Sequence, residues 1–155
     1  MKRIKLLGII LITLVVLVGC SVGGDKTRKL SCTNSEDVTG LIMTQMVDIT
    51  FKGDKATKMK LTLKNQVTDE DLKKQWDLIV KSFDELYNKE KLGKGIKLST
   101  KADKKSYTHT IIIDVDVTKA TREDLYTHGI DGIVDTTNTY AEVKKEAEKS
   151  GFNCK

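Results

Sequence analysis

Residues 41–64 read LIMTQMVDITFKGDKATKMKLTLK and contain two runs in which apolar and polar side chains alternate. The first run places on one face Leu41, Met43, Val47, Ile49 and Phe51. The second run places on one face Thr57, Met59, Leu61 and Leu63. A period of two is typical of a half-buried β-strand, and the Gly53-Asp54 dipeptide between the runs is a turn signal. This stretch therefore predicts an antiparallel β-hairpin.

Residues 96–117 predict a second hairpin with a turn near Asp103-Lys104. Its return strand is the clearest in the chain, because every odd position but one from Tyr107 to Val117 carries an apolar or aromatic residue. The exception is His109, which we expect to be partly buried with its ring nitrogens bonded to a backbone group or a hydroxyl. The opposite face of this strand carries two carboxylates, Asp114 and Asp116.

Two helices are predicted, one after each hairpin. Thr68 before three acidic residues marks a helix start. An apolar stripe at helical spacing then continues to Tyr87 and includes Trp76, which we assign to the core. Thr139 and Glu142 form a capping-box signature for a C-terminal helix, which Gly151 ends.

The order of elements is therefore ββαββα, which predicts an α+β fold. In this fold an antiparallel sheet is built from the two hairpins, and the long amphipathic helix and the C-terminal helix pack on one face of it.

The first twenty residues predict export. Basic residues at positions 2, 3 and 5 precede an apolar run over residues 6–18, as in a secretory signal peptide. Leu17-Val18-Gly19-Cys20 resembles the bacterial lipobox, which implies that Cys20 takes a diacylglycerol and becomes the new N-terminus. The alternative is an ordinary secretory signal in which Cys20 is incidental. The predicted organisation is a lipoprotein signal peptide over 1–19, a lipidated cysteine and flexible tether over 20–28, and one α+β domain over 29–155.

The charge balance argues against nucleic acid as a partner. Removing residues 1–19 leaves 136 residues with 24 Lys and Arg against 22 Asp and Glu, a net charge of only +2. No long basic block interleaved with aromatic residues is present in the sequence.

The two other cysteines, Cys32 and Cys154, form an even pair in a chain that is predicted to be exported. A bridge between them would close a loop of 122 residues. In the chain-entropy model, such a loop contributes at most about 4–5 kcal/mol. The alternative is two free, buried thiols.

Several of these features together resemble the YehR-like small bacterial lipoproteins. They are the lipobox, Ser31-Cys32 soon after it, the hairpin with Phe51 to Asp54 at its turn, the long helix and the near-terminal cysteine. The resemblance implies an exported lipoprotein domain with no established activity. The only residue roles that the resemblance implies are lipidation of Cys20 and pairing of Cys32 with Cys154.

No catalytic residue, metal ligand or cofactor site is predicted. The loop residues His128, Asp131 and Asp135 could ligate a metal, but their spacing matches no closed metal motif. Asp114 and Asp116 could act as an acid/base pair, but lysines of the first hairpin share their face. We therefore expect a solvated, charge-balanced sheet surface. The sequence contains no nucleophile elbow and no Gly-rich phosphate loop.

The sequence favours a non-enzymatic cell-envelope lipoprotein, anchored by Cys20 on the extracytoplasmic face of the cell membrane. We expect it to be a binding or interaction module for an envelope protein or a small ligand. One alternative is a metal-dependent envelope enzyme centred on His128, Asp131 and Asp135. The other is a purely structural envelope protein.

Overall fold

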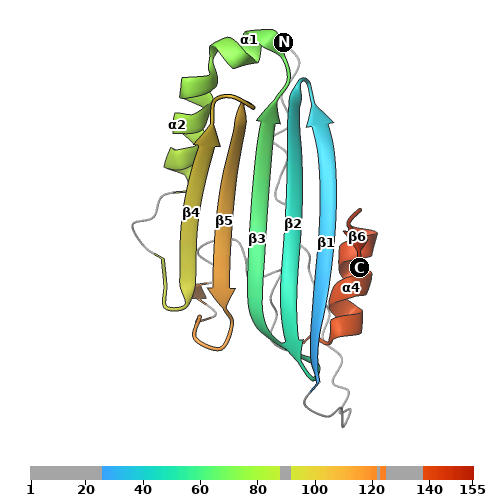
Figure 1. The fold of residues 1–155 in the computed structure, drawn as a ribbon. Coiled ribbons are helices and arrows are strands. Elements are labelled where there is room, and N and C mark those ends of the chain that lie inside the picture. The colour runs from blue at the N-terminus through green and yellow to red at the C-terminus, as the bar shows by residue number, and fades with distance from the viewer. Residues whose placement is uncertain (1–25, 88–91, 122, 125–137) are drawn as a thin grey trace.

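The computed structural model describes residues 26–87, 92–121, 123–124 and 138–155. Within these ranges the chain is α+β, as predicted, with an antiparallel six-stranded sheet in the order β4-β5-β3-β2-β1-β6 (Figure 1). Its elements are β1 (Thr27–Val38), β2 (Leu41–Lys52), β3 (Lys55–Val67), α1 (Glu70–Lys74), α2 (Trp76–Leu86), β4 (Ile96–Asp103), β5 (Thr108–Asp116), α4 (Tyr140–Lys149) and β6 (Asn153–Cys154).

Both predicted hairpins are confirmed. β2 and β3 turn at Gly53-Asp54, where Lys52 faces Lys55 and Gly53 adopts a φ of 63° that favours glycine. β4 and β5 pair from Ile96 opposite Val115 to Asp103 opposite Thr108. β3 pairs with β5 in the centre of the sheet, so the two hairpins form one continuous structure.

The predicted ββαββα order is wrong because it lacks β1. This strand pairs with β2 over its whole length, from Thr27 opposite Lys52 to Val38 opposite Leu41. The connecting residues Thr39 and Gly40 both have positive φ, 53° and 83°, as in the two-residue turns that match the twist of a hairpin. β1 begins at Thr27, so the last two residues of the tether predicted over 20–28 belong to this strand.

The predicted long helix is divided in two. Asp69, rather than Thr68, caps α1, because its carboxylate accepts from the backbone N–H groups of Asp71 and Leu72 at 2.9 Å each. α1 ends at Gln75 and α2 begins at Trp76. Trp76 is buried, as predicted, and its ring packs edge-on against Tyr107 with the centroids 5.7 Å apart.

The core lies between one face of the sheet and two helices. It contains buried residues of five strands, among them Leu30, Ile49, Phe51, Leu61, Ile96, Ile111, Ile113 and Val115. α2 contributes Phe83, whereas α4 contributes Tyr140, whose ring meets Phe51 edge-on at 5.4 Å. In Figure 1, α2 lies by β4 at one side of the sheet and α4 lies by β1 and β6 at the other. Both helices pack against the same core, as predicted for helices on one face.

The C-terminus is fastened to β1. Thr139 and Glu142 form the predicted capping box at the start of α4, and Gly151 with a φ of 86° follows the end of this helix. β6 then pairs with β1, and it places Cys154 opposite Cys32 with an S–S distance of 2.00 Å. The backbone groups of Ser31 and Lys155 exchange two hydrogen bonds beside this disulfide, at 3.1 and 2.9 Å.

Replacing Cys154 tests how much the disulfide stabilises the fold. We expect Cys154→Ser to lose about 2–4 kcal/mol, because the bridge restricts the unfolded chain. A domain of this size is stable by roughly 5–15 kcal/mol, so the variant should stay folded with a lower Tm. Amide hydrogen exchange should speed up first in residues 150–155. The unmodified protein under reductant is the control, and a Tm that reductant does not change would contradict the prediction.

Replacing Thr139 tests the cap of α4. Thr139→Ala removes the hydroxyl that accepts from the Glu142 N–H and should cost about 1 kcal/mol. Hydrogen bonds from the Thr139 N–H and hydroxyl lower the pKa of Glu142. Their stabilising effect is therefore present above the ordinary carboxyl pKa and is lost as the pH falls. Urea unfolding at neutral and acidic pH should show a smaller difference between variant and parent in acid; an equal difference at both pH values would contradict this coupling.

Candidate functional site

The face of the sheet opposite α2 and α4 carries the candidate site, and we call it the open face. The alternation along β3 decides what lies on it: Leu61 points into the core, so its neighbours Lys60 and Thr62 point away. The strand register extends this alternation across the sheet. One row of the open face consists of Lys97, Asp114, Lys60, Asp48 and Ser31, in order from β4 to β1.

This row alternates in charge. The Lys60 ammonium lies 3.5 Å from the Asp114 carboxylate, and both side chains are about half exposed, each at 51%. The Asp48 carboxylate accepts a hydrogen bond of 2.5 Å from the Ser31 hydroxyl. The prediction of a solvated, charge-balanced surface around Asp114 is therefore confirmed.

The neighbouring row contains Asp116, Lys58, Thr50 and Lys29. Asp116 is held by the loop after β5, because its carboxylate accepts from the Thr118 hydroxyl at 2.6 Å and lies 3.0 Å from the Lys119 ammonium. These contacts, that of Thr118 first, lower the pKa of Asp116, which is the opposite of what a general acid requires. Among the described residues, Lys29 and Lys58 form no ion pair.

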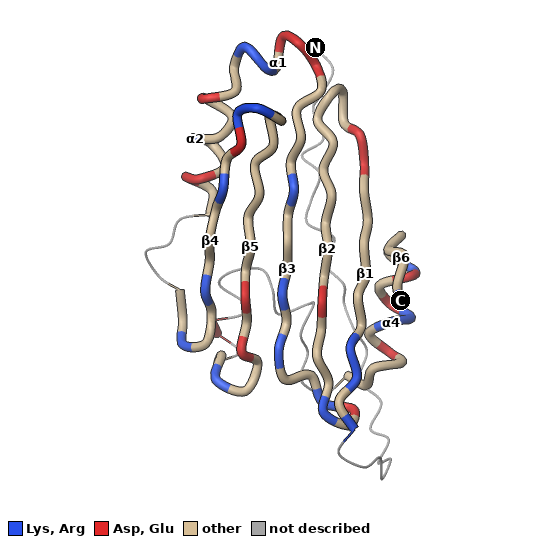
Figure 2. The backbone as a smooth tube through the Cα atoms, in the orientation of Figure 1, with Lys and Arg blue, Asp and Glu red and all other residues tan. Residues whose placement is uncertain are grey.

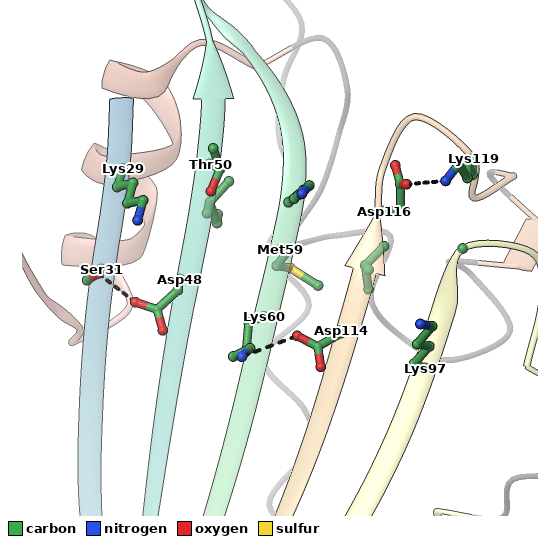
Figure 3. A pocket seen from close by; sticks show the side chains of 14 residues that line it. Lys29, Ser31, Asp48, Thr50, Met59, Lys60, Lys97, Asp114, Asp116 and Lys119 are labelled. Carbon is green, nitrogen blue, oxygen red and sulfur yellow. Dashed lines mark hydrogen bonds and ion pairs between the residues drawn. The ribbon is translucent and has the colours of Figure 1, made fainter. Parts of the chain in front are cut away.

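A groove of about 850 Å³ runs across these two rows. Figure 3 shows the side chains of β1, β2, β3, β5 and β4 that line it, and Lys119 from the loop after β5 closes one side. Its walls are mostly lysines, aspartates and hydroxyls, while its floor includes Met59 and Val115 of the core strands. The groove is therefore suited to a polar or charged ligand rather than to an apolar one.

The next row along the open face is less polar. It consists of Ser99, Ile112, Thr62, Met46 and Thr33. Ile112 and Met46 are half-buried even though no described helix covers them. This row separates the charged groove from the far end of the sheet.

The prediction for His109 is corrected. This residue is fully buried, at 1% exposure, and its Nε2 lies 3.2 Å from the carboxylate of Asp84 on α2 rather than near a backbone group or hydroxyl. Its ring stacks on Phe83 with a centroid distance of 5.5 Å, and its Nδ1 has no partner among the described residues. His109 and Asp84 therefore join β5 to α2 within the structure and do not face the groove.

The remaining predicted site residues lie outside the described residues. These are Cys20 and the loop residues His128, Asp131 and Asp135. Within the described ranges, no group of three His, Cys, Asp or Glu side chains could hold a metal ion. None of the helices in those ranges has the length and apolar character needed to cross a membrane.

The sequence alone did not indicate the groove, because its walls come from five strands. Lys29 and Ser31 belong to β1, which was not predicted, and Asp48, Lys60 and Asp114 meet only through the register of β2, β3 and β5. The signal that could have indicated them is that lysine and aspartate recur at outward positions of the strands, which alternate with the buried residues. Asp84 had no comparable signal, since it is one of several acidic residues on α2.

Comparison with known proteins supports the fold. No protein-family model matches the chain, and no curated protein is significantly similar to it in sequence. The NMR structure of a protein from Streptococcus pneumoniae TIGR4 is similar in fold, with a TM-score of 0.57, 17% identity and 92% of each chain covered. The NMR structure of E. coli YehR matches with a TM-score of 0.47 and 20% identity over 84% of this chain and 92% of YehR, which is too weak to support a conclusion.

Removing the partner of His109 tests the buried contact. Asp84→Ala leaves the buried Nε2 without its carboxylate and should destabilise the protein by about 1–3 kcal/mol. Glu85→Ala is the matched control, because Glu85 is the next residue on α2 and is 68% exposed, with a 3.7 Å ion pair to Lys81. It should change stability by less than about 0.5 kcal/mol. Equal effects of the two variants in chemical unfolding would show that the contact with His109 contributes nothing.

Proposed function

We propose that the chain is a membrane-anchored binding module of the bacterial cell envelope, and that the open face is its binding surface. The observation that carries this proposal is the groove of about 850 Å³ on that face. Its charged side chains stand on paired strands whose other face is buried against α2 and α4, so they are presented by a rigid scaffold. A polar partner can therefore bind without reorganisation of the sheet.

The anchor is proposed from the N-terminal sequence. Leu17-Val18-Gly19-Cys20 has the lipobox pattern. A single acyl chain binds a membrane only weakly, so the two chains of a diacylglycerol would provide the stable hold, which a net charge of +2 cannot. β1 begins at Thr27, so the seven residue steps from Cys20 span at most about 25 Å. The domain would thus stay close to the membrane that anchors it.

The fold is compatible with the YehR-like lipoproteins, and we propose membership of that group. The support is the combination of the lipobox, the Cys32 and Cys154 pair and the hairpin with Phe51 to Asp54 at its turn. The pneumococcal likeness adds support for the fold alone. The metal-dependent enzyme centred on His128, Asp131 and Asp135 remains the alternative hypothesis.

Fractionation of cells that express Cys20→Ser tests the anchor. We expect the variant to leave the membrane fraction or to accumulate as uncleaved precursor, because the acylated thiol is lost. Intact mass of the parent should show the acyl chains. A variant that is still membrane-bound, cleaved and of the same mass as the parent would contradict the proposal.

Photo-crosslinking in intact cells tests the binding face. A photoreactive residue at Lys58 or Thr50 lies in the groove, whereas one at Glu148 lies on α4, behind the sheet. We expect crosslinked adducts, seen as a mass increase, at the two groove positions and not at position 148. Adducts only at position 148, or none at any position, would contradict the assignment of the open face.

A further inference from the structure

A second hollow lies on the open face, beyond the row of Ile112 and Met46. Its volume is about 290 Å³. The register of three neighbouring strands places Lys64 of β3, Thr110 of β5 and Lys101 of β4 in one row across it. We call these three residues the lysine clamp.

The geometry of the sheet brings both ammonium groups to one ligand. Neighbouring strands lie about 4.8 Å apart, so Lys64 and Lys101 leave the backbone roughly 10 Å apart, on either side of Thr110. Each lysine has a flexible four-carbon stem that can lean over the threonine. Figure 2 shows positive segments on β3 and β4 with an uncharged stretch of β5 between them.

The clamp carries unneutralised charge. Within the described part of the chain, neither Lys64 nor Lys101 forms an ion pair, and the Thr110 hydroxyl forms no hydrogen bond. The one carboxylate of the hollow, Asp103, attracts Lys101 only weakly and is engaged by its own turn. It accepts from the Ser106 hydroxyl at 2.8 Å and from the Lys105 N–H at 3.0 Å.

The row through Asp114 provides the contrast. Lys60 and Lys97 occupy the same two strands and the same face, four residues before Lys64 and Lys101. The residue between them, however, is a carboxylate and not a hydroxyl, and Lys60 forms an ion pair with it at 3.5 Å. The two rows therefore differ in the one side chain that determines whether a pair of lysines is free to bind an anion.

We propose that the lysine clamp binds a phosphate group of an envelope ligand. This inference rests on the proposed function, since it names the chemistry that the open face recognises. Two ammonium groups and a hydroxyl offer several hydrogen-bond donors to one site, which matches an oxyanion with several acceptor oxygens. Hydrogen bonds between charged partners are also stronger than neutral ones.

The position of the clamp favours a phosphate that does not belong to the anchoring membrane. The clamp row meets β1 at Ser35, eight residues after β1 begins at Thr27. At about 3.4 Å per residue, the clamp lies roughly 27 Å along the sheet from the end that the tether enters. A phosphorylated polymer or free phosphate can reach this end more readily than the headgroups around the anchor.

Binding measurements on the full chain purified from its host test the clamp. Calorimetric titrations use three probes: inorganic phosphate, linear polyphosphate and phosphatidylglycerol vesicles. We expect Lys64→Gln combined with Lys101→Gln to weaken binding of polyphosphate by about tenfold or more, because two charge-assisted contacts are lost. The matched control is Lys145→Gln combined with Lys149→Gln on α4, which removes the same charge outside the open face and should weaken binding by less than about threefold. Equal Tm values would show that both double variants are folded.

The outcomes separate the clamp from the general proposal. Binding of inorganic phosphate or polyphosphate that the clamp variant weakens supports the inference. Tighter binding of inorganic phosphate would indicate that the natural ligand is free phosphate, and tighter binding of polyphosphate would indicate a phosphorylated polymer. Binding to vesicles alone would overturn the assignment to a ligand away from the membrane. Equal losses in the two double variants, or no binding of any probe, would overturn the clamp itself. The anchoring and crosslinking results would stand in each of these cases, since neither depends on Lys64 or Lys101.

Discussion

The pairing of β3 with β2 on one side and β5 on the other is the constraint on which the structure depends. Because side chains alternate along a strand, a shift of one residue in this pairing would bring Lys60 and Lys64 into the core and expose Leu61. Burial of Leu61, Ile113 and their neighbours therefore fixes the register. The same register sets the order of lysines, aspartates and hydroxyls on the open face. The core and the candidate binding surface are thus two consequences of one pairing.

The edge of the sheet at β1 needs additional support. Beyond Leu30 and Cys32, the inward positions of this strand carry Asn34 and Glu36, which bury little apolar surface. β1 is stabilised instead by pairing with β2 over its whole length, by the disulfide to Cys154 and by the hydrogen bonds between Ser31 and Lys155. α4 packs beside this edge through Tyr140. The C-terminal segment thus supports the strand from which Lys29 and Ser31 line the groove.

Local patterns were sufficient to predict much of the fold. The hairpins of β2 with β3 and β4 with β5 and the capping box of Thr139 and Glu142 follow from periodicity or spacing. The pair of Cys32 and Cys154 was favoured by the even number of cysteines in a chain predicted to be exported. β1 could not be predicted because its alternation is too weak without its partner strand. The break at Gln75 also has no local signal, since the helical stripe passes through it unchanged. The groove and the contact of His109 with Asp84 are tertiary features that join distant residues, such as Lys60 with Asp114, 54 positions apart, and Asp84 with His109, 25 positions apart.

Solvent exposure of three consecutive isoleucines tests the register most directly. Ile111 and Ile113 lie in the core at 0% and 4% exposure, whereas Ile112 lies between them on the open face. In methyl NMR spectra with a soluble paramagnetic agent, we expect the Ile112 signals to broaden strongly while those of Ile111 and Ile113 stay sharp. Similar broadening of all three, or protection of Ile112 alone, would contradict the division of the sheet into a core face and an open face.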